Sequence, residues 1–104
     1  MARTQNLTTL TNVVCAVAGT AYPLSADPNL FVKSLMIQSV PTNTGDIAVG
    51  DSANQEIYLT TGRSVTIYGD NMDNGTTAKL QVSSIFVRST VNGEQVSVTV
   101  LENL

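Results

Sequence analysis

Apolar and polar residues alternate with a period of two along most of the chain, and turn-forming residues separate the alternating runs. The pattern is clearest in 94–101, where Val96, Val98 and Val100 would share one face. Such alternation is typical of a β-strand with one buried side. No segment carries a sustained helical stripe, and about a third of the residues are Val, Ile or Thr, which favour strands. The pattern therefore predicts an all-β fold.

Further strands are expected wherever the alternation resumes between turn residues. The run 30–40 is almost continuously apolar, which predicts a longer central strand covered on both faces. In 56–60, Ile57 and Leu59 are expected to face inward. About seven to eight short strands of this kind predict an antiparallel β-sandwich or a jelly-roll-like barrel. The other expected strands are 12–20, 46–49, 64–68 and 85–87.

Two features near the end of the chain concern its geometry. Asn92-Gly93 lies between 85–87 and 94–101. Asn-Gly is the preferred pair for a type I′ turn, so a hairpin between these two strands is expected. The parity of the apolar positions changes around 83–84, which predicts a bulge or a break in the strand there.

The chain has 104 residues, the length of one ordinary domain. Its first residues are mostly polar and rich in Thr, with Leu7 and Leu10 as the large apolar exceptions. We therefore expect 1–11 to form an extended N-terminal arm and 12–104 to form a single β-sandwich domain.

Charged residues are scarce, at 12% of the chain against about 25% in typical proteins. A surface poor in charge is weakly protected against self-association, so it is either simply polar or covered in an assembly. The net charge is −3 and the basic residues are scattered, so direct binding of nucleic acid is not expected. No polybasic or long apolar segment predicts contact with a membrane, and synthesis in a cytoplasm is expected.

Few residues are suited to catalysis. Histidine is absent, which excludes a Ser-His-Asp set and a zinc site of His and Cys. The lone Cys15 lies in an apolar run and is expected to be a small buried residue. The segment 70–75 resembles part of a calcium loop but lacks ligands of that pattern, which favours a plain polar loop. Asp46 and Asp51 are better interpreted as loop-capping residues than as a hydrolase pair. No catalytic residue, metal or cofactor is expected.

Tyr58 and Tyr68 fall on the outward parity of their strands. Outward tyrosines on a charge-poor surface are typical of a protein contact, and partial packing on a neighbouring sheet is the alternative. An extended arm can also add a strand to the sheet edge of a partner. The expected interface residues are Arg3, Thr4, Gln5, Asn6, Leu7, Tyr58 and Tyr68.

Four stretches, read together, resemble small virion proteins of tailed bacteriophages. They are NTGDIAVGD at 43–51, LTTGRSVTI at 59–67, IFVRS at 85–89 and GEQVSV at 93–98. These motifs consist mostly of turn and core residues, so they concern the fold more than the role. Phe86 stands where such proteins commonly have tyrosine. The resemblance implies a β-sandwich without enzymatic activity.

The role that the resemblance implies is structural. We expect a head decoration (cement) protein on the capsid surface of the virion, bound to the major capsid protein and favouring a homotrimer. The arm would then lie across neighbouring capsid subunits. The alternative is a tail- or connector-associated module that binds a host surface glycan or another virion protein. A carboxylate-based hydrolase ranks last.

Overall fold

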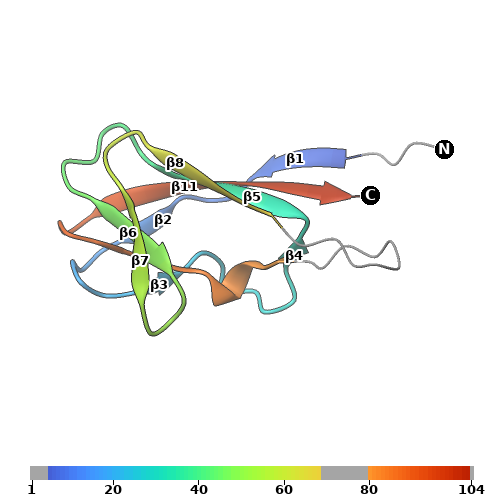
Figure 1. Ribbon diagram of the computed structural model, residues 1–104, viewed down its shortest axis with the longest axis horizontal. Helices are drawn as coiled ribbons and strands as arrows, with labels where there is room; N and C mark the ends of the chain where they lie inside the picture. The colour runs from blue at the N-terminus through green and yellow to red at the C-terminus, as the bar shows by residue number, and fades with distance from the viewer. Residues whose placement is uncertain (1–4, 69–79, 104) are drawn as a thin grey trace.

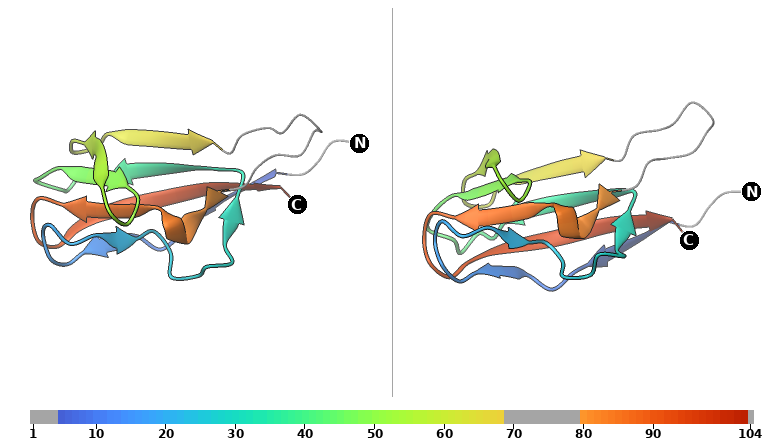
Figure 2. Two further views of the ribbon diagram at one scale, coloured as in Figure 1. Left: turned by 60° about the horizontal axis from the view of Figure 1, so that its bottom comes forward. Right: turned by 90° about the horizontal axis from the view of Figure 1, so that it is seen from below.

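Two antiparallel sheets pack face to face in the computed structural model, which describes residues 5–68 and 80–103. Figure 1 shows the arrangement of the strands, and Figure 2 shows the two layers from two further directions. The elements of the described residues are β1 (Gln5–Thr9), β2 (Val13–Cys15), β3 (Tyr22–Pro23), β4 (Phe31–Val32), β5 (Ser34–Ser39), β6 (Ile47–Gly50), β7 (Gln55–Leu59), β8 (Ser64–Tyr68), β9 (Leu80–Gln81), the 3-10 helix η1 (Val82–Ser84), β10 (Phe86–Ser89) and β11 (Glu94–Asn103).

The strand order defines the architecture. Sheet A has the order β1-β11-β5-β8, with β2 also paired with β11, and sheet B has the order β3-β10-β6-β7. A separate two-stranded ladder joins β4 and β9. The chain crosses between the sheets from β2 to β3, from β5 to β6, from β7 to β8 and from β10 to β11, and it also changes sheet between β3 and β5 and between β8 and β10. This winding is that of an eight-stranded jelly roll, and it confirms the predicted antiparallel all-β sandwich.

Alternate residues of facing strands build the core. Val96, Val98 and Val100 of β11 are at most 1% exposed, as their alternation predicts. Ile47 and Val49 of β6 join the same buried cluster from sheet B. Burying a side chain of this size contributes about 1.5–3 kcal/mol. The period-two pattern was therefore a sound guide to which residues hold the sheets together.

In strand β7, the alternation of the sequence does not predict burial correctly. Leu59 is 4% exposed, as expected, but Ile57 is 46% exposed. Ile57 pairs with the buried Val49, so its side chain does point to the inner side of sheet B. β7 is an edge strand, however, and solvent reaches Ile57 there. The expectation that Ile57 is buried is wrong. Alternation along a strand determines to which side of the sheet a side chain points, but not whether other residues cover it there.

The apolar run 30–40 forms two strands with a break at Lys33. β5 is central in sheet A, between β11 and β8, whereas β4 leaves this sheet and pairs with β9. The backbone N–H of Lys33 donates to the carbonyl of Leu101 at 3.1 Å. One face of β5 is open, since Met36 is 37% exposed. The prediction of a single strand covered on both faces is therefore wrong, although the predicted central position in the sheet is confirmed for β5.

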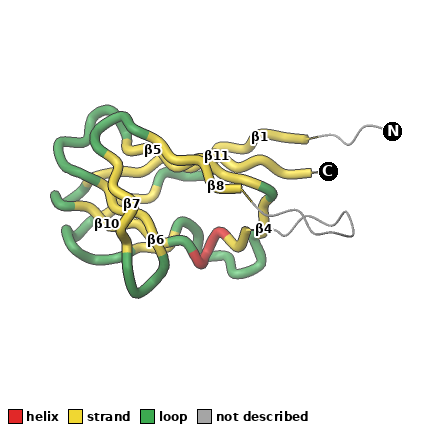
Figure 3. The backbone as a smooth tube through the Cα atoms, viewed as in Figure 1, coloured by secondary structure: helices red, strands yellow, loops and turns green. Residues whose placement is uncertain are grey.

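The break expected around 83–84 is present as the 3-10 helix η1, the single helical turn in Figure 3. The hydroxyl of Ser84 donates to the carbonyl of Gln81 at 2.7 Å and closes this turn. Val82 remains fully buried within it. One extra turn between β9 and β10 accounts for the change in apolar parity.

The predicted hairpin at Asn92-Gly93 is wrong. β10 lies in sheet B and β11 in sheet A, so the turn links the two sheets. A type I′ turn needs positive φ at both central residues. Gly93 has a φ of 78°, but Asn92 does not have a positive φ. The side chain of Asn92 instead accepts a hydrogen bond from the N–H of Ala18 at 2.7 Å, which fixes the link to a neighbouring loop.

Part of the expected arm is a strand of sheet A. β1 pairs antiparallel with the last half of β11, and β2 pairs with its first half. The strand expected over 12–20 is therefore only three residues long. Figure 1 shows β1 and the end of β11 extending side by side beyond the strands of sheet B. This overhang gives sheet A an outer surface that sheet B does not match.

Candidate protein interface

A row of three large, mainly apolar side chains and one serine crosses the outer face of sheet A at this overhanging end. Leu7 of β1 lies opposite Leu101 of β11, and Leu101 lies opposite Ser34 of β5. Ser34 in turn lies opposite Tyr68 of β8. Cross-strand partners point to the same face, so these four side chains form one row across the whole sheet.

The outer face becomes more polar away from this end. The second row holds Met36 between threonines. The third row is entirely polar. Its members are Ser97, Gln38 and Ser64. We call Leu7, Met36, Tyr68 and Leu101 the outer-sheet patch.

The outer-sheet patch is open to solvent and shallowly hollowed. Leu7 is 75% exposed and Tyr68 is 72% exposed. A groove of about 360 Å³ runs between these side chains, and its lining contains no charged residue. Scattered apolar side chains are normal on a protein surface, whereas a contiguous apolar group around a groove is a candidate binding surface.

The structure brings together two of the interface residues expected from sequence, Leu7 and Tyr68. The backbones of Gln5 and Asn6 belong to the same strand as Leu7, and Arg3 and Thr4 lie outside the described residues. Tyr58 is exposed, as expected, but it lies in sheet B. The seven expected residues therefore do not form one surface.

Tyr58 has a local partner on sheet B. The guanidinium of Arg88 lies 5.9 Å from the centre of the Tyr58 ring. The same guanidinium donates to the Tyr58 hydroxyl at 3.2 Å and to the carbonyl of Gln55 at 3.1 Å. Beneath them, Ala48 pairs with both residues and is 3% exposed. Arg88 and Tyr58 thus cover the outer face of sheet B with a side-chain pair from the chain itself.

Met36 and Leu101 were not among the expected interface residues. Both stand on the outward parity of their strands, next to the inward Ile37 and Val100. That parity was readable from the sequence, but the pairing of β11 with both β1 and β5 was not. Long-range register is what places the two residues beside Leu7.

The edges of the two sheets differ. The edge strands of sheet A, which are β1 and the short β2 on one side and β8 on the other, contain neither charge nor proline. In sheet B, β3 is two residues long and ends in Pro23, and β7 carries Glu56 beside a bulge at Val49/Gly50. Short strands, proline, charge and bulges discourage edge-to-edge pairing. Sheet A therefore has two unprotected edges.

The motif at 43–51 has a structural role, which the buried Glu94 explains. Glu94 is 7% exposed, and its Oε1 accepts from the N–H groups of Thr44 and Gly45 at 2.7 and 2.6 Å. The hydroxyl of Thr44 donates to the same oxygen at 3.1 Å. Burial acts to raise the pKa of Glu94, but these hydrogen bonds outweigh it, and the pKa lies below its ordinary value.

Asn43 completes this connection between the sheets. Its side-chain amide donates to Ser39 Oγ at 3.0 Å and to the carbonyl of Gln95 at 2.7 Å. Its side-chain oxygen accepts from the N–H of Gln95 at 2.9 Å. Asn43 is 6% exposed, so the loop between β5 and β6 is held to the start of β11 by buried hydrogen bonds.

The carboxylates considered for hydrolysis take local structural positions where the structure describes them. Asp51 Oδ1 accepts from the N–H groups of Ala53 and Asn54, and these bonds lower the pKa of Asp51. The backbone N–H of Asp46 donates to Thr90 Oγ1 at 3.0 Å, and the carbonyl of Asp46 accepts from the N–H of Thr90 at 3.1 Å. In 5–68 and 80–103 no group of His, Cys, Asp and Glu is arranged to hold a metal ion. The segment 70–75 lies outside the described residues.

Cys15 is fully buried, as expected for a small apolar residue. Burial raises the pKa of its thiol, and the nearby Glu94 carboxylate acts in the same direction, whereas a hydrogen bond with Ser89 opposes them. A raised pKa and no exposure leave little reactive thiolate. Cys15 is therefore a core residue.

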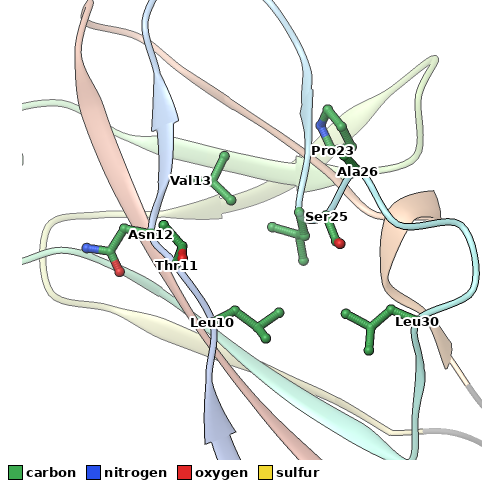
Figure 4. A pocket seen from close by; sticks show the side chains of 9 residues that line it. Leu10, Thr11, Asn12, Val13, Pro23, Ser25, Ala26 and Leu30 are labelled. Carbon is green, nitrogen blue, oxygen red and sulfur yellow. The ribbon is translucent and has the colours of Figure 1, made fainter.

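A second groove, of about 460 Å³, opens at the side of the sandwich between the sheets. Leu10 and Leu30 point toward one another across it in Figure 4. It lies where the chain passes from β1 to β2 and loses part of its pairing with β11. Leu24 closes its floor at 4% exposure. The groove continues the core toward solvent and contains no charged lining residue.

Comparisons with known proteins found no match: no protein-family model matches the chain, and no curated protein is significantly similar to it. Among the residues that the structure describes, no helix has the length and apolar character needed to cross a bilayer.

Proposed function

We propose that this chain is a non-enzymatic structural protein of a tailed-bacteriophage virion, bound to the major capsid protein on the capsid surface as a decoration (cement) protein. The observation that carries the proposal is the outer-sheet patch, an uncharged apolar surface between two unprotected strand edges. Such a surface is typical of a contact between proteins.

Two further observations support this role. The jelly roll is an architecture shared by viral capsid and lectin domains. A fold alone does not determine function, so the sequence resemblance to phage virion proteins adds the second support. Its motif at 43–51 is used here to hold β6 against β11 through Glu94, which suits a rigid structural module.

A homotrimer made in the host cytoplasm is the form in which we propose that the protein binds the capsid. Several linked copies raise the effective affinity for a repeating lattice without any new kind of contact. Neither nucleic acid nor a membrane is a proposed partner, since the chain carries a net charge of −3 and few basic residues.

The direct test is to locate the protein in purified virus particles by cryo-electron microscopy and to count its copies by quantitative mass spectrometry. Many copies in a regular arrangement on the capsid are expected. A few copies at the tail, or none in the particle, would contradict the decoration role.

A rebinding assay tests the surface. Leu7→Lys places a charge in the outer-sheet patch, whereas Tyr58→Lys places one on the outer face of sheet B. We expect Leu7→Lys to reduce binding to particles that lack the protein by at least about tenfold, which corresponds to roughly 1.4 kcal/mol. Tyr58→Lys is the matched control and is expected to bind normally. Equal loss in both variants would contradict a specific role for sheet A.

The Tyr58 and Arg88 pair supports a second candidate function, a tail- or connector-associated module that binds a host surface glycan. Tyr58 is 59% exposed, and an exposed aromatic ring beside a guanidinium offers stacking and hydrogen bonds to a sugar. A glycan array decides this candidate. Binding that disappears in Tyr58→Ala would favour it over the decoration role.

A further inference from the structure

Among residues 5–68 and 80–103, no strand pairs with the outer edge of β1, and the backbone groups that face this edge follow a definite pattern. The N–H of Leu10 donates to the carbonyl of Val98 at 2.9 Å, so Leu10 faces β11. In an antiparallel ladder, successive residues direct their N–H and C=O groups to opposite sides. Thr8 therefore also faces β11, whereas Leu7 and Thr9 direct their backbone groups to the open edge.

The open edge of β8 follows the same rule. The N–H of Ser39 donates to the carbonyl of Arg63 at 2.9 Å, so Arg63 faces β5. Alternation then turns Val65 and Ile67 toward β5 as well. Thr66 and Tyr68 direct their backbone groups to the open edge, and their side chains lie on the outer face of sheet A.

The two edges fit one another. Each neighbouring pair in the order β1-β11-β5-β8 is antiparallel, so β1 and β8 run in opposite directions. A second copy placed beside the first in the same orientation would bring its β1 antiparallel to β8. Opposing Tyr68 to Leu7 of the second copy then opposes Thr66 to Thr9. In this register the free backbone groups meet, and all four side chains stay on the outer face.

We infer that β8 of one copy pairs with β1 of a second copy, head to tail, and that the copies close into a ring. The row that ends at Tyr68 then continues through Leu7 into the next subunit. Neither edge strand carries a charge that would repel the other. Both unprotected edges of every copy are covered by the same contact.

A head-to-tail contact between copies makes either a closed ring or an open filament, and we infer the ring. Continuous antiparallel sheets twist and coil, and a head-to-tail interface makes a closed ring where the rotation between copies allows it. Sheet B covers the inner face of sheet A, so pairing at the edges extends sheet A in its own plane and joins the outer-sheet patches of neighbouring copies into one surface. A second copy is therefore the occupant of the two open edges, and the outer-sheet patch stays exposed beside the contact.

Engineered disulfides test the pairing in the purified full chain, without any virus particle. Directly opposed residues that exchange backbone hydrogen bonds have Cα atoms about 5.5 Å apart, which a disulfide can span. The native Cys15 is fully buried and does not interfere. The variants are Leu7→Cys, Tyr68→Cys and the combination of both, oxidised and run on non-reducing gels.

We expect only the double variant to form bonds between subunits, as one discrete ring whose mass light scattering confirms. Dimers from Leu7→Cys alone would indicate β1 paired with β1 and overturn the inference. Absence of bonds in the double variant would overturn it as well. Because the assay needs no capsid, its failure is distinguishable from failure of the proposed decoration role.

Two single proline variants test whether backbone hydrogen bonds hold the copies together. Leu7→Pro removes an N–H that faces the open edge, and proline is tolerated on such an edge. Thr8→Pro removes an N–H that faces β11. We expect Leu7→Pro to give folded monomers with a nearly unchanged Tm, and Thr8→Pro to lower the Tm. A ring that persists in Leu7→Pro would contradict the proposed pairing.

Discussion

Sheets A and B of this jelly roll are built from the same kinds of residues but meet solvent in different ways. On the outer face of sheet B, Arg88 lies over Tyr58 and Ala48 is buried beneath them. On the outer face of sheet A, Leu7 and Tyr68 are both more than two-thirds exposed, at 75% and 72%. Within the part of the chain that the structure describes, side chains of the chain itself cover the outer face of sheet B and leave the outer face of sheet A exposed.

The edges repeat this difference. Pro23 ends one edge of sheet B, and Glu56 and the bulge at Gly50 lie at the other. The strands QNLTT and SVTIY at the edges of sheet A have no such protection. The edges of sheet B carry features that discourage strand pairing, and the edges of sheet A do not. Association between copies is therefore expected through sheet A.

The largest change in stability is expected from a substitution at Gly50, in the bulge at the edge of sheet B. A Cβ added at Gly50 would lie 2.1 Å from the carbonyl oxygen of Asn54 and 2.7 Å from Gln55 Cα. Both are backbone atoms, so Gly50→Ala must displace β7. We expect a loss of about 2–3 kcal/mol in the free energy of unfolding, measured by urea denaturation.

The exposed Ala53, in the same loop, provides the control. Ala53→Ser changes one atom on the surface and is expected to stay within about 0.5 kcal/mol of the original chain. If Gly50→Ala were equally mild, the bulge would not be a rigid feature of sheet B, and the contrast between the edges would weaken.

The junction between the sheets comes next. Asn43→Ala removes the hydrogen bonds to Ser39 and Gln95 and leaves buried polar groups without partners. We expect a loss of about 2 kcal/mol, since each unsatisfied buried group costs about 1–3 kcal/mol. The exposed Asn29 is a matched control, and Asn29→Ala should be close to neutral in the same denaturation experiment. Equal effects would show that the Asn43 network contributes little.

The pH dependence of stability tests the neighbouring carboxylate. The pKa of Glu94 lies below its ordinary value of 4.5 in the folded chain, so the folded state binds its proton less readily than the unfolded state does. Its contribution is therefore complete above about pH 4.5 and is lost as the pH falls through the lowered folded value.

We expect the Tm of the original chain to fall more steeply below pH 4.5 than that of Glu94→Gln. Asp51, whose pKa is also lowered, remains in both chains and contributes equally. Thermal melts between neutral and acidic pH measure the difference. Parallel curves would mean that the Glu94 carboxylate does not hold the 43–51 loop.

Sequence alone was sufficient for the local parts of this picture. Alternation located the buried faces of β8 and β11 because side-chain direction depends only on neighbouring residues. The same reasoning placed Tyr58 and Tyr68 on outward faces, and both are exposed. The change of parity before β10 was visible because η1 shifts the register of the residues on either side of it.

The non-local parts could not be derived in this way. The dipeptide Asn92-Gly93 indicates a turn, but not that β11 joins the opposite sheet from β10. Glu94 resembles any surface residue after a turn until the 43–51 loop folds over it. The outer-sheet patch likewise depends on pairing between β1 and β11, which join opposite ends of the chain. These features depend on which distant strands pair and in which register, and the local sequence pattern does not determine that pairing.

The smallest effects on stability are expected at the two exposed tyrosines, which test the difference between sheets A and B most directly. Tyr58→Ala removes the contact with Arg88 and should cost about 0.5–1 kcal/mol, the value of an exposed cation–π pair. Tyr68→Ala should cost less than about 0.5 kcal/mol, because Tyr68 is 72% exposed and projects from an edge strand. In sedimentation at rising concentration the order should reverse, with only Tyr68→Ala reducing self-association. If Tyr68→Ala instead destabilised the isolated chain more than Tyr58→Ala, sheet A would already be covered within one subunit, and its exposed face would not be a surface for association.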